Sequence, residues 1–142
     1  MGKVRAVCLS AEKGTPKHNV GRGEFLVRHG LKGDAHAGDW HRQVSLLSYQ
    51  KIQDFRSQGA EVVDGAFGEN LVVEGIDFRN LPVGTILHCG EAVLEMTQIG
   101  KECHNHCEIF KRMGDCIMPR EGVFAKVIRE GTITIGDELY AE

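Results

Sequence analysis

The stretch Thr85-Ile-Leu-His-Cys-Gly-Glu-Ala-Val-Leu-Glu-Met-Thr97 determines the fold class. Two runs rich in aliphatic residues, 85–88 and 92–97, flank a short connection that contains Gly90. Two such runs on either side of a glycine-containing turn predict an antiparallel β-hairpin. The echo of 84–90 in Gly131-Thr-Ile-Thr-Ile-Gly136 indicates that the same turn chemistry is used twice, although an internal repeat is an alternative explanation.

The same reasoning extends to the rest of the chain. Val4, Ala6 and Cys8 alternate with polar positions and predict a half-buried opening strand. Further strands are predicted at 24–28, 43–47, 69–74 and 138–140, and a second hairpin from 123–129 and 132–135. One helix is predicted after a Ser48 N-cap, with Tyr49, Ile52 and Phe55 on one face and Gly59 beyond its end, and a second short helix at 104–113. The expected fold is therefore mainly β, a barrel or sandwich with one or two short helices.

Length and composition set the class of protein. The chain has 142 residues, which predicts a single domain over 1–142. Lys and Arg number 17 against 20 Asp and Glu, and this net charge of −3 argues against a nucleic-acid partner.

The first residues lack the apolar core of a signal peptide, and no apolar run approaches the roughly 18 residues of a membrane span. We therefore expect a cytoplasmic protein with no membrane partner, in which the five cysteines stay reduced.

A Cys- and His-rich stretch carries the first candidate site. Thr97-Gln-Ile-Gly-Lys-Glu-Cys-His-Asn-His-Cys107 is followed by Cys116. Cys103 is predicted where a strand gives way to a helix, and Lys101 and His104 add positive charge, which favours a nucleophilic thiolate. Two other interpretations stay open, namely cysteines that serve as buried apolar residues and a zinc site built from Cys103, Cys107, Cys116 and one histidine.

Two further polar clusters precede that stretch. The first lies in a glycine-rich loop and contains Lys32, Asp34, His36, Asp39, His41 and Arg42. It can bind a metal, or an anion through basic side chains and backbone N–H groups, or be a solvated loop with incidental charges. The second cluster, Phe67-Gly-Glu-Asn70, can be a binding turn or only the entry to a strand.

Together these clusters resemble the MOSC domain, named for the C-terminal domain of molybdenum cofactor sulfurases. The resemblance rests on Gly33-Asp-Ala-His-Ala-Gly38 with 42–47, on 67–71, on Leu81-Pro-Val-Gly84, and on 97–103 with 114–122. It is closest to the small stand-alone bacterial members. The larger members have Arg-x-Pro-Cys where this chain has Gly100-Lys-Glu-Cys103, so cofactor contacts of that arginine are not carried over.

The resemblance implies a β-barrel-like fold and a role in molybdenum cofactor chemistry. The resemblance implies that the chain is a sulfur carrier or a molybdopterin-binding protein. Cys103, helped by Lys101 and His104, accepts sulfane sulfur as a persulfide or ligates molybdenum. The resemblance also implies partners: a pyridoxal phosphate-dependent cysteine desulfurase and a molybdoenzyme or cofactor-maturation protein. The expected cofactor-binding residues are Lys32, Asp34, His36, Arg42, Glu69, Asn70 and Arg120.

Two other functions remain open at this point. One is a non-catalytic binding or adaptor module stabilised by zinc at Cys103, Cys107 and Cys116. The other is a small redox enzyme that depends on bound molybdopterin. Whether the protein is an enzyme is therefore undecided, with sulfur transfer in cofactor maturation as the expected activity.

Overall fold

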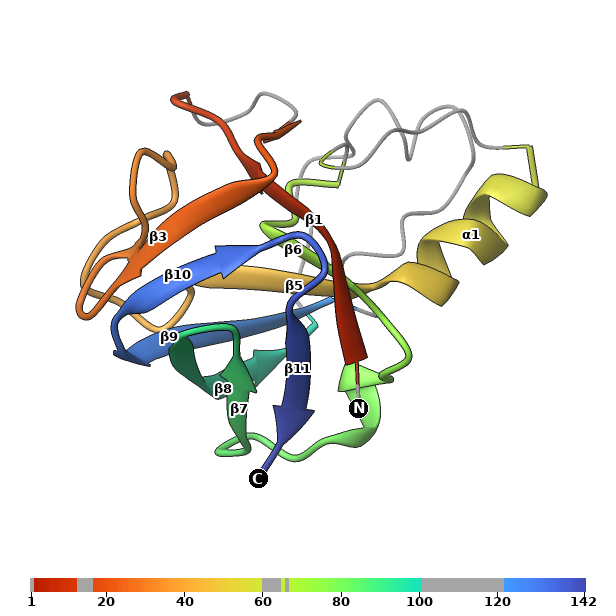
Figure 1. Ribbon diagram of the computed structural model, residues 1–142. Helices are drawn as coiled ribbons and strands as arrows, with labels where there is room; N and C mark the ends of the chain where they lie inside the picture. The colour runs from red at the N-terminus through yellow and green to blue at the C-terminus, as the bar shows by residue number, and fades with distance from the viewer. Residues whose placement is uncertain (1, 13–16, 60–64, 66, 101–121) are drawn as a thin grey trace.

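The structure is a computed structural model that describes residues 2–12, 17–59, 65, 67–100 and 122–142. In this part of the chain, seven strands close into a mixed β-barrel (Figure 1). In hydrogen-bonded order they are β11 (Glu138–Ala141), β7 (Ile86–Cys89), β8 (Ala92–Ile99), β9 (Val123–Arg129), β5 (Val44–Ser48), β6 (Leu71–Glu74) and β1 (Gly2–Leu9). Pairing of β1 with β11, where Gly2 lies opposite Leu139, completes the ring. The predicted mainly β, barrel-like fold is confirmed.

Most neighbouring barrel strands are antiparallel, and β5 and β6 are parallel. The hairpin predicted at 85–97 is present as β7 and β8, with Cys89 opposite Ala92 across the turn at Gly90-Glu91. The two-residue strand β2 (His18–Asn19), which has no counterpart among the predicted strands, adds to β1. The opening strand and those near 43–47, 69–74 and 138–140 are also present.

The predicted second hairpin is wrong in its pairing, although both of its strands exist. β10 (Gly131–Thr134) pairs with β3 (Arg22–Leu26), which in turn pairs with β4 (Gly30–Leu31) in a separate three-stranded sheet. Only Glu130 lies between β9 and β10, so the chain bends instead of reversing beside β9. β10 then crosses the β7–β8 turn, where the Glu91 N–H donates to the Thr132 carbonyl at 3.2 Å. A Cβ at Gly131 would overlap the Glu91 backbone at this crossing.

A bulge in β1 divides the apolar side chains between two clusters. The register of β1 against β6 shifts between Val4 and Ala6. Val4 and Val7 therefore belong to the large cluster of the barrel, whereas Ala6 and Cys8 belong to a second, smaller cluster. The alternation of 4, 6 and 8 correctly predicts burial, but the three side chains contribute to different clusters.

The helix α1 (Tyr49–Ser57) follows β5 directly and lies outside the barrel (Figure 1). Its buried residues Ile52 and Phe55 pack in the smaller cluster, as the predicted apolar face requires. Ser48 occupies the N-cap position but makes no side-chain capping hydrogen bond there. A short 3₁₀ helix, η1 (Phe78–Asn80), was not expected from the sequence, and the predicted helix at 104–113 lies outside the described residues. None of the described helices has the length and apolar character to cross a membrane.

Candidate functional site

Four strands bring distant parts of the sequence into one row at an end of the barrel. Ser45 of β5 lies opposite Phe124 of β9, and Phe124 lies opposite Gln98 of β8. On the other side of Ser45, Asn70 immediately precedes β6, and its N–H donates to the Ser45 carbonyl at 2.9 Å. β5, β6 and β9 begin near this row, and β8 ends near it. The described residues just before β5, β6 and β9 and just after β8 therefore lie at the same end of the barrel.

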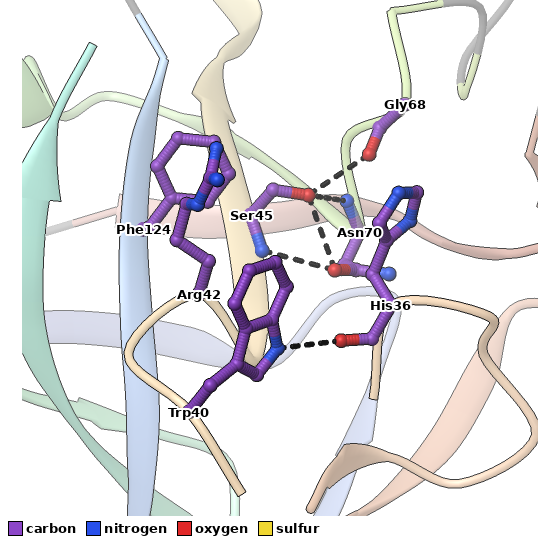
Figure 2. A pocket seen from close by; sticks show the side chains of 7 residues that line it. All are labelled: His36, Trp40, Arg42, Ser45, Gly68, Asn70 and Phe124. Atoms are coloured by element: carbon purple, nitrogen blue, oxygen red, sulfur yellow. Dashed lines mark hydrogen bonds between the residues drawn. The ribbon is translucent and has the colours of Figure 1, made fainter. Parts of the chain in front are cut away.

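A pocket opens beside this row. It encloses about 420 Å³ of empty space, solvent at its mouth included. Its lining residues are His36, Trp40, Arg42, Ser45, Gly68, Asn70 and Phe124 (Figure 2). Three of the predicted cofactor-binding residues, His36, Arg42 and Asn70, are thus brought together although they come from two separate sequence clusters.

Arg42 is the unsatisfied cation of the pocket. Its guanidinium carbon lies 4.9 Å from the centroid of the Trp40 ring and 5.5 Å from that of Phe124 (Figure 2). Both contacts are cation–π interactions that hold the side chain in place without using its N–H donors. In the part of the chain that the structure describes, Arg42 Nε is buried and has no hydrogen-bond partner. A buried donor without an acceptor is costly, so this nitrogen is available to an acceptor from outside the described residues.

A buried ion pair lies next to His36. Lys17 Nζ donates to Asp34 Oδ1 at 2.6 Å, and both side chains are almost fully shielded from solvent, at 1% and 0% exposure. Lys17 Nζ also lies 3.1 Å from His36 Nδ1. The Asp34 carboxylate further accepts the backbone N–H of Ser10 at 3.2 Å and that of His36 at 3.3 Å. Asp34 therefore orders the loop around His36.

The environment of Asp34 favours its charged form. Burial alone would raise the pKa of this carboxyl. The hydrogen bond and charge of Lys17, the Ser10 N–H and a hydrogen bond with Asn70 outweigh burial and hold the pKa below its ordinary value. Asp34 is thus a carboxylate that is already fully engaged by protein donors.

Ser45 and Asn70 form the floor of the pocket. Asn70 Oδ1 accepts from the Ser45 N–H at 2.9 Å, and Asn70 Nδ2 donates to the Cys8 carbonyl at 3.0 Å. The Ser45 hydroxyl contacts the Gly68 carbonyl at 2.9 Å and Asn70 Oδ1 at 3.1 Å (Figure 2). These bonds fix the two side chains rigidly in a buried position.

Glu69 is fully buried and organises the turn before β6. Its two carboxylate oxygens accept the backbone N–H groups of Gly65 and Phe67, each at 3.0 Å. Gly65 in turn accepts the Lys17 N–H at 3.0 Å. Glu69 does not line the pocket, and its described contacts instead support the turn against which Lys17 packs.

The outer part of the glycine-rich loop is arranged differently. Lys32 is exposed and pairs with Glu24 at 3.6 Å, away from the residues that line the pocket. His41 Nε2 lies 3.0 Å from Gln98 Oε1, and the Thr97 hydroxyl donates to the His41 carbonyl. The loop is therefore attached to the end of β8, from which the Cys-rich segment departs.

The predicted reactive segment falls outside the described residues. Lys101, Cys103, His104, Cys107, Cys116 and Arg120 all lie in 101–121. The described neighbours of this segment meet, because the Gly100 N–H donates to the Gly122 carbonyl at 2.6 Å. Gly100 and Gly122, the described residues on either side of this segment, are thus held together, and Gly122 is two residues from Phe124 in the pocket wall.

The two described cysteines are both buried. Cys8 packs in the smaller apolar cluster and Cys89 in the barrel core, as expected for cysteines that serve as small apolar residues. Burial, together with the charge of Asp137, raises the pKa of the Cys89 thiol to about 12. Among the described residues, no group of three or more His, Cys, Asp and Glu side chains could hold a metal ion.

Comparison with family models identifies the domain. The model of the MOSC domain matches residues 32–140, which is well over half of the chain and includes the pocket and the segment that follows β8. The chain belongs to the MOSC domain family.

Solved structures share this MOSC fold. The YuaD protein from Bacillus subtilis superposes with a TM-score of 0.80 at 19% identity, over 98% of this chain and 94% of that one. YiiM from Geobacillus stearothermophilus gives a TM-score of 0.74 at 16% identity, over 100% of this chain and 75% of that one. YiiM from Escherichia coli gives 0.64 at 20% identity, over 99% and 69%. The resemblance to small bacterial MOSC proteins is confirmed, and at these identities the likeness concerns the fold.

A curated relative of another kind also matches. The large ribosomal subunit protein uL2 from Methylococcus capsulatus is 30% identical over 84 residues, which are 57% of this chain and 30% of the ribosomal protein. The chain thus corresponds to less than a third of that relative, and no role is carried over from it.

Lys17, Ser45 and Phe124 belong to the site but were not predicted as site residues. Lys17 lies outside the predicted strands, helices and polar clusters, and a single lysine there gives no signal of its burial. Ser45 and Phe124 lie within predicted strands, and the strand pairing that places them beside each other cannot be read from local patterns. The tandem of Trp40 and Arg42, by contrast, is a visible signal, because an aromatic and a guanidinium group two residues apart can stack.

Proposed function

We propose that this protein binds the molybdenum cofactor in the pocket at the end of the barrel and acts in the handling of its sulfur. The observation that carries the proposal is the buried Arg42 Nε, which has no acceptor among the described residues, in a pocket lined mostly by residues of the sequence clusters that resemble the MOSC domain. A guanidinium is the side chain best suited to a phosphate, and the cofactor carries one on its pterin.

The donor set fits the anionic end of the cofactor. Arg42 is held between Trp40 and Phe124, so its planar donors are oriented before a ligand arrives and little rotamer entropy is lost on binding. Asn70 and His36 line the same pocket and can contribute to recognition of the pterin or the phosphate. Asp34 and Glu69 support this proposal indirectly, because their described bonds order the surrounding loops. Lys32 and Arg120 remain candidates for outer contacts.

The chain path supports a role for Cys103 beside this pocket. Cys103 follows Gly100 by three residues, and three extended residues span at most about 11 Å. Gly100 itself is hydrogen-bonded to Gly122, near Phe124 in the pocket wall. We therefore propose that Cys103 presents its sulfur to a ligand held by Arg42, with Lys101 and His104 favouring the thiolate.

The sulfur-carrier step is a displacement without net oxidation. The Cys103 thiolate attacks the outer sulfur of a persulfide on a cysteine desulfurase, forming a new S–S bond on Cys103. The S–S bond of the donor breaks, and its cysteine leaves as a thiolate. A bound molybdenum cofactor would supply a metal centre with soft sulfur ligands, which the Cys103 thiolate would ligate. Delivery of the persulfide sulfur to that centre as sulfide would take two electrons from a pair of thiols, which would be oxidised to a disulfide while Cys103 returned to its thiol form.

Arginine variants test the binding part of the proposal. Equilibrium binding of isolated molybdenum cofactor is measured for the wild type, Arg42→Lys and Arg42→Gln, with exposed Arg129→Gln as the matched control. Loss of a bidentate charge-assisted contact is expected to weaken binding by Arg42→Gln about 10- to 100-fold. Arg42→Lys keeps the charge but not the planar fork, so an intermediate loss is expected. Equal affinity of Arg42→Gln and Arg129→Gln would contradict the proposal.

Mass spectrometry tests the carrier part. After incubation with a pyridoxal phosphate-dependent cysteine desulfurase and cysteine, the wild type is expected to gain about 32 Da, one sulfur atom. Cys103→Ala should lack this adduct, whereas buried Cys89→Ala should keep it. An adduct of equal yield on Cys103→Ala would show that another group carries the sulfur.

A further inference from the structure

Lys17 is the most buried cation in the described chain that no binding role explains. Its side chain is 1% exposed, and its ammonium contacts two groups, Asp34 Oδ1 at 2.6 Å and His36 Nδ1 at 3.1 Å. Lys17 does not line the pocket, whereas His36 does. The ion pair therefore connects to the pocket through His36 and through the hydrogen bond between Asp34 and Asn70.

The chemistry of the three groups determines which ring nitrogen carries the proton. An ammonium has three N–H donors and no acceptor, so a nitrogen that is hydrogen-bonded to it must accept. His36 Nδ1 is consequently the bare nitrogen, and the proton of the neutral ring lies on Nε2. The salt bridge of Lys17 with Asp34 orients the ammonium beside this nitrogen.

The surrounding backbone holds Lys17 in this position. Its N–H donates to the Gly65 carbonyl at 3.0 Å, and a Cβ on Gly65 would overlap the Lys17 carbonyl. The Glu69 carboxylate fixes Gly65, and Asp34 accepts the N–H of His36 itself at 3.3 Å. The Trp40 indole N–H donates to the His36 carbonyl at 2.9 Å, which ties the His36 backbone to Trp40 (Figure 2). Such a network orients one imidazole against rotation.

We infer that Lys17 is a positioning residue, which fixes His36 as the Nε2–H tautomer and so makes it a hydrogen-bond donor at the pocket. His36 and Arg42 then both present hydrogen-bond donors to the pocket. Two donors suit a ligand group that only accepts hydrogen bonds, such as a phosphate oxygen. The identity of the ligand rests on the proposed function, whereas the tautomer is a property of the protein alone.

Nitrogen-15 NMR of the histidine rings in the ligand-free protein tests the inference directly. Long-range ¹H–¹⁵N correlation distinguishes a protonated from a bare ring nitrogen, and His36→Gln identifies the His36 signals by their loss. At pH 7.5 the wild type is expected to show a protonated Nε2 and a bare Nδ1. A proton on Nδ1, or on both nitrogens, would overturn the inference.

Variants then test whether Lys17 is the cause. Lys17→Met alone would leave the buried Asp34 carboxylate without its counter-charge, so the double variant Lys17→Met/Asp34→Asn removes both charges together. In that variant the shifts of both ring nitrogens should move toward an average of the two tautomers. Lys17→Arg retains a cationic donor and is expected to restore the wild-type pattern. Ring shifts that are identical in the wild type and the double variant would show that Lys17 does not set the tautomer.

Binding of isolated molybdenum cofactor completes the test. The double variant is expected to bind about 10-fold more weakly than the wild type, with Lys17→Arg close to the wild type. A changed tautomer with unchanged affinity would show that His36 does not donate to the ligand and would overturn that part of the inference. Absence of cofactor binding by the wild type, with the predicted tautomer present, would refute the proposed function and leave the assignment of Lys17 standing.

Discussion

Single residues decide the electrostatics of the pocket, and Asp34 is the one on which most contacts depend. Its carboxylate bonds Lys17, Ser10 and the His36 backbone, all within a buried region. Removal of one partner from a buried ion pair leaves the other charge uncompensated. Asp34 therefore contributes to stability as well as to the shape of the site.

Asp34→Asn is expected to lower the free energy of unfolding by about 3–5 kcal/mol at pH 7, because buried Lys17 loses its counter-charge. The pKa of Asp34 is lower in the folded than in the unfolded protein, so its stabilising effect is complete above the unfolded value of about 4 and is lost as the pH falls through the folded value. The wild type and Asp34→Asn should therefore converge in stability below about pH 4, as measured by urea denaturation.

The control for this prediction is the exposed pair between Lys32 and Glu24. Glu24→Gln should change stability by at most about 1 kcal/mol, because solvent screens exposed ion pairs. An equal loss in Glu24→Gln and Asp34→Asn would contradict the special role of the buried pair.

Thiol reactivity provides a second prediction at this scale. Since the pKa of Cys89 is raised to about 12, almost none of it is thiolate at pH 8. A thiol-modifying reagent, followed by peptide mass mapping, should leave Cys89 and buried Cys8 unmodified in the native protein and label both after denaturation. Labelling of native Cys89 at the rate of an unfolded peptide would refute its burial in the barrel core.

At the scale of elements, the turn before β6 supports the pocket from behind. Gly65 has a φ of +93° and its carbonyl accepts the Lys17 N–H. Glu69 fixes the same turn through two backbone N–H groups. The turn thus connects β6 through hydrogen bonds to Lys17, whose ion pair with Asp34 lies beside His36.

Gly65→Ala is expected to destabilise the protein more than a change of backbone preference alone explains. A left-handed φ costs a non-glycine residue about 1–2 kcal/mol, and here the added Cβ also overlaps the Lys17 carbonyl. Gly84→Ala is the matched control, because Gly84 has a φ of +97° with nothing within 4 Å of the added Cβ. The midpoint temperature of thermal denaturation should be much lower for Gly65→Ala than for Gly84→Ala. Equal midpoint temperatures would contradict the predicted overlap.

Local patterns in the sequence predicted the elements better than their pairing. The β7–β8 hairpin is local, so the two apolar runs and Gly90 suffice to predict it. β10 instead pairs with β3, where Gly131 lies opposite Phe25, and no local signal reports a partner so far away in the chain. Periodicity likewise cannot reveal a buried cation such as Lys17, because only the folded protein supplies its carboxylate partner.

The residues of the pocket were likewise predicted only in part from the sequence. His36, Arg42 and Asn70, which were expected from the sequence to bind a cofactor, line one pocket. Their meeting depends on the row from Asn70 through Ser45 to Phe124, which is a result of sheet register. The role of Cys103 stays a prediction, because this residue lies outside the described part of the chain.

At the scale of the whole molecule, closure of the barrel depends on the pairing of β1 with β11. This seam joins the two ends of the described chain, which lie near each other in Figure 1. Leu139 of β11 is fully buried in the large cluster, whereas the neighbouring Tyr140 is 46% exposed. Ser45 of β5 and Phe124 of β9, which line the pocket, belong to the same barrel.

Leu139→Ala is expected to lower the free energy of unfolding by about 2–5 kcal/mol, because it leaves a cavity at the seam. Tyr140→Ala on the same strand should have a smaller effect, since it removes an exposed ring that stacks on His88. Urea denaturation of both variants measures the difference. A smaller loss for Leu139→Ala than for Tyr140→Ala would contradict the closed barrel.

The central claim, that the pocket holds the molybdenum cofactor through Arg42, is tested most directly by the pterin content of the purified protein. The wild type and Arg42→Gln are purified from a molybdenum-replete host, denatured, oxidised and examined for pterin fluorescence. We predict a stoichiometric pterin signal from the wild type and a strongly reduced signal from Arg42→Gln. A wild-type protein free of pterin, from cells whose own molybdoenzymes are loaded, would contradict the account.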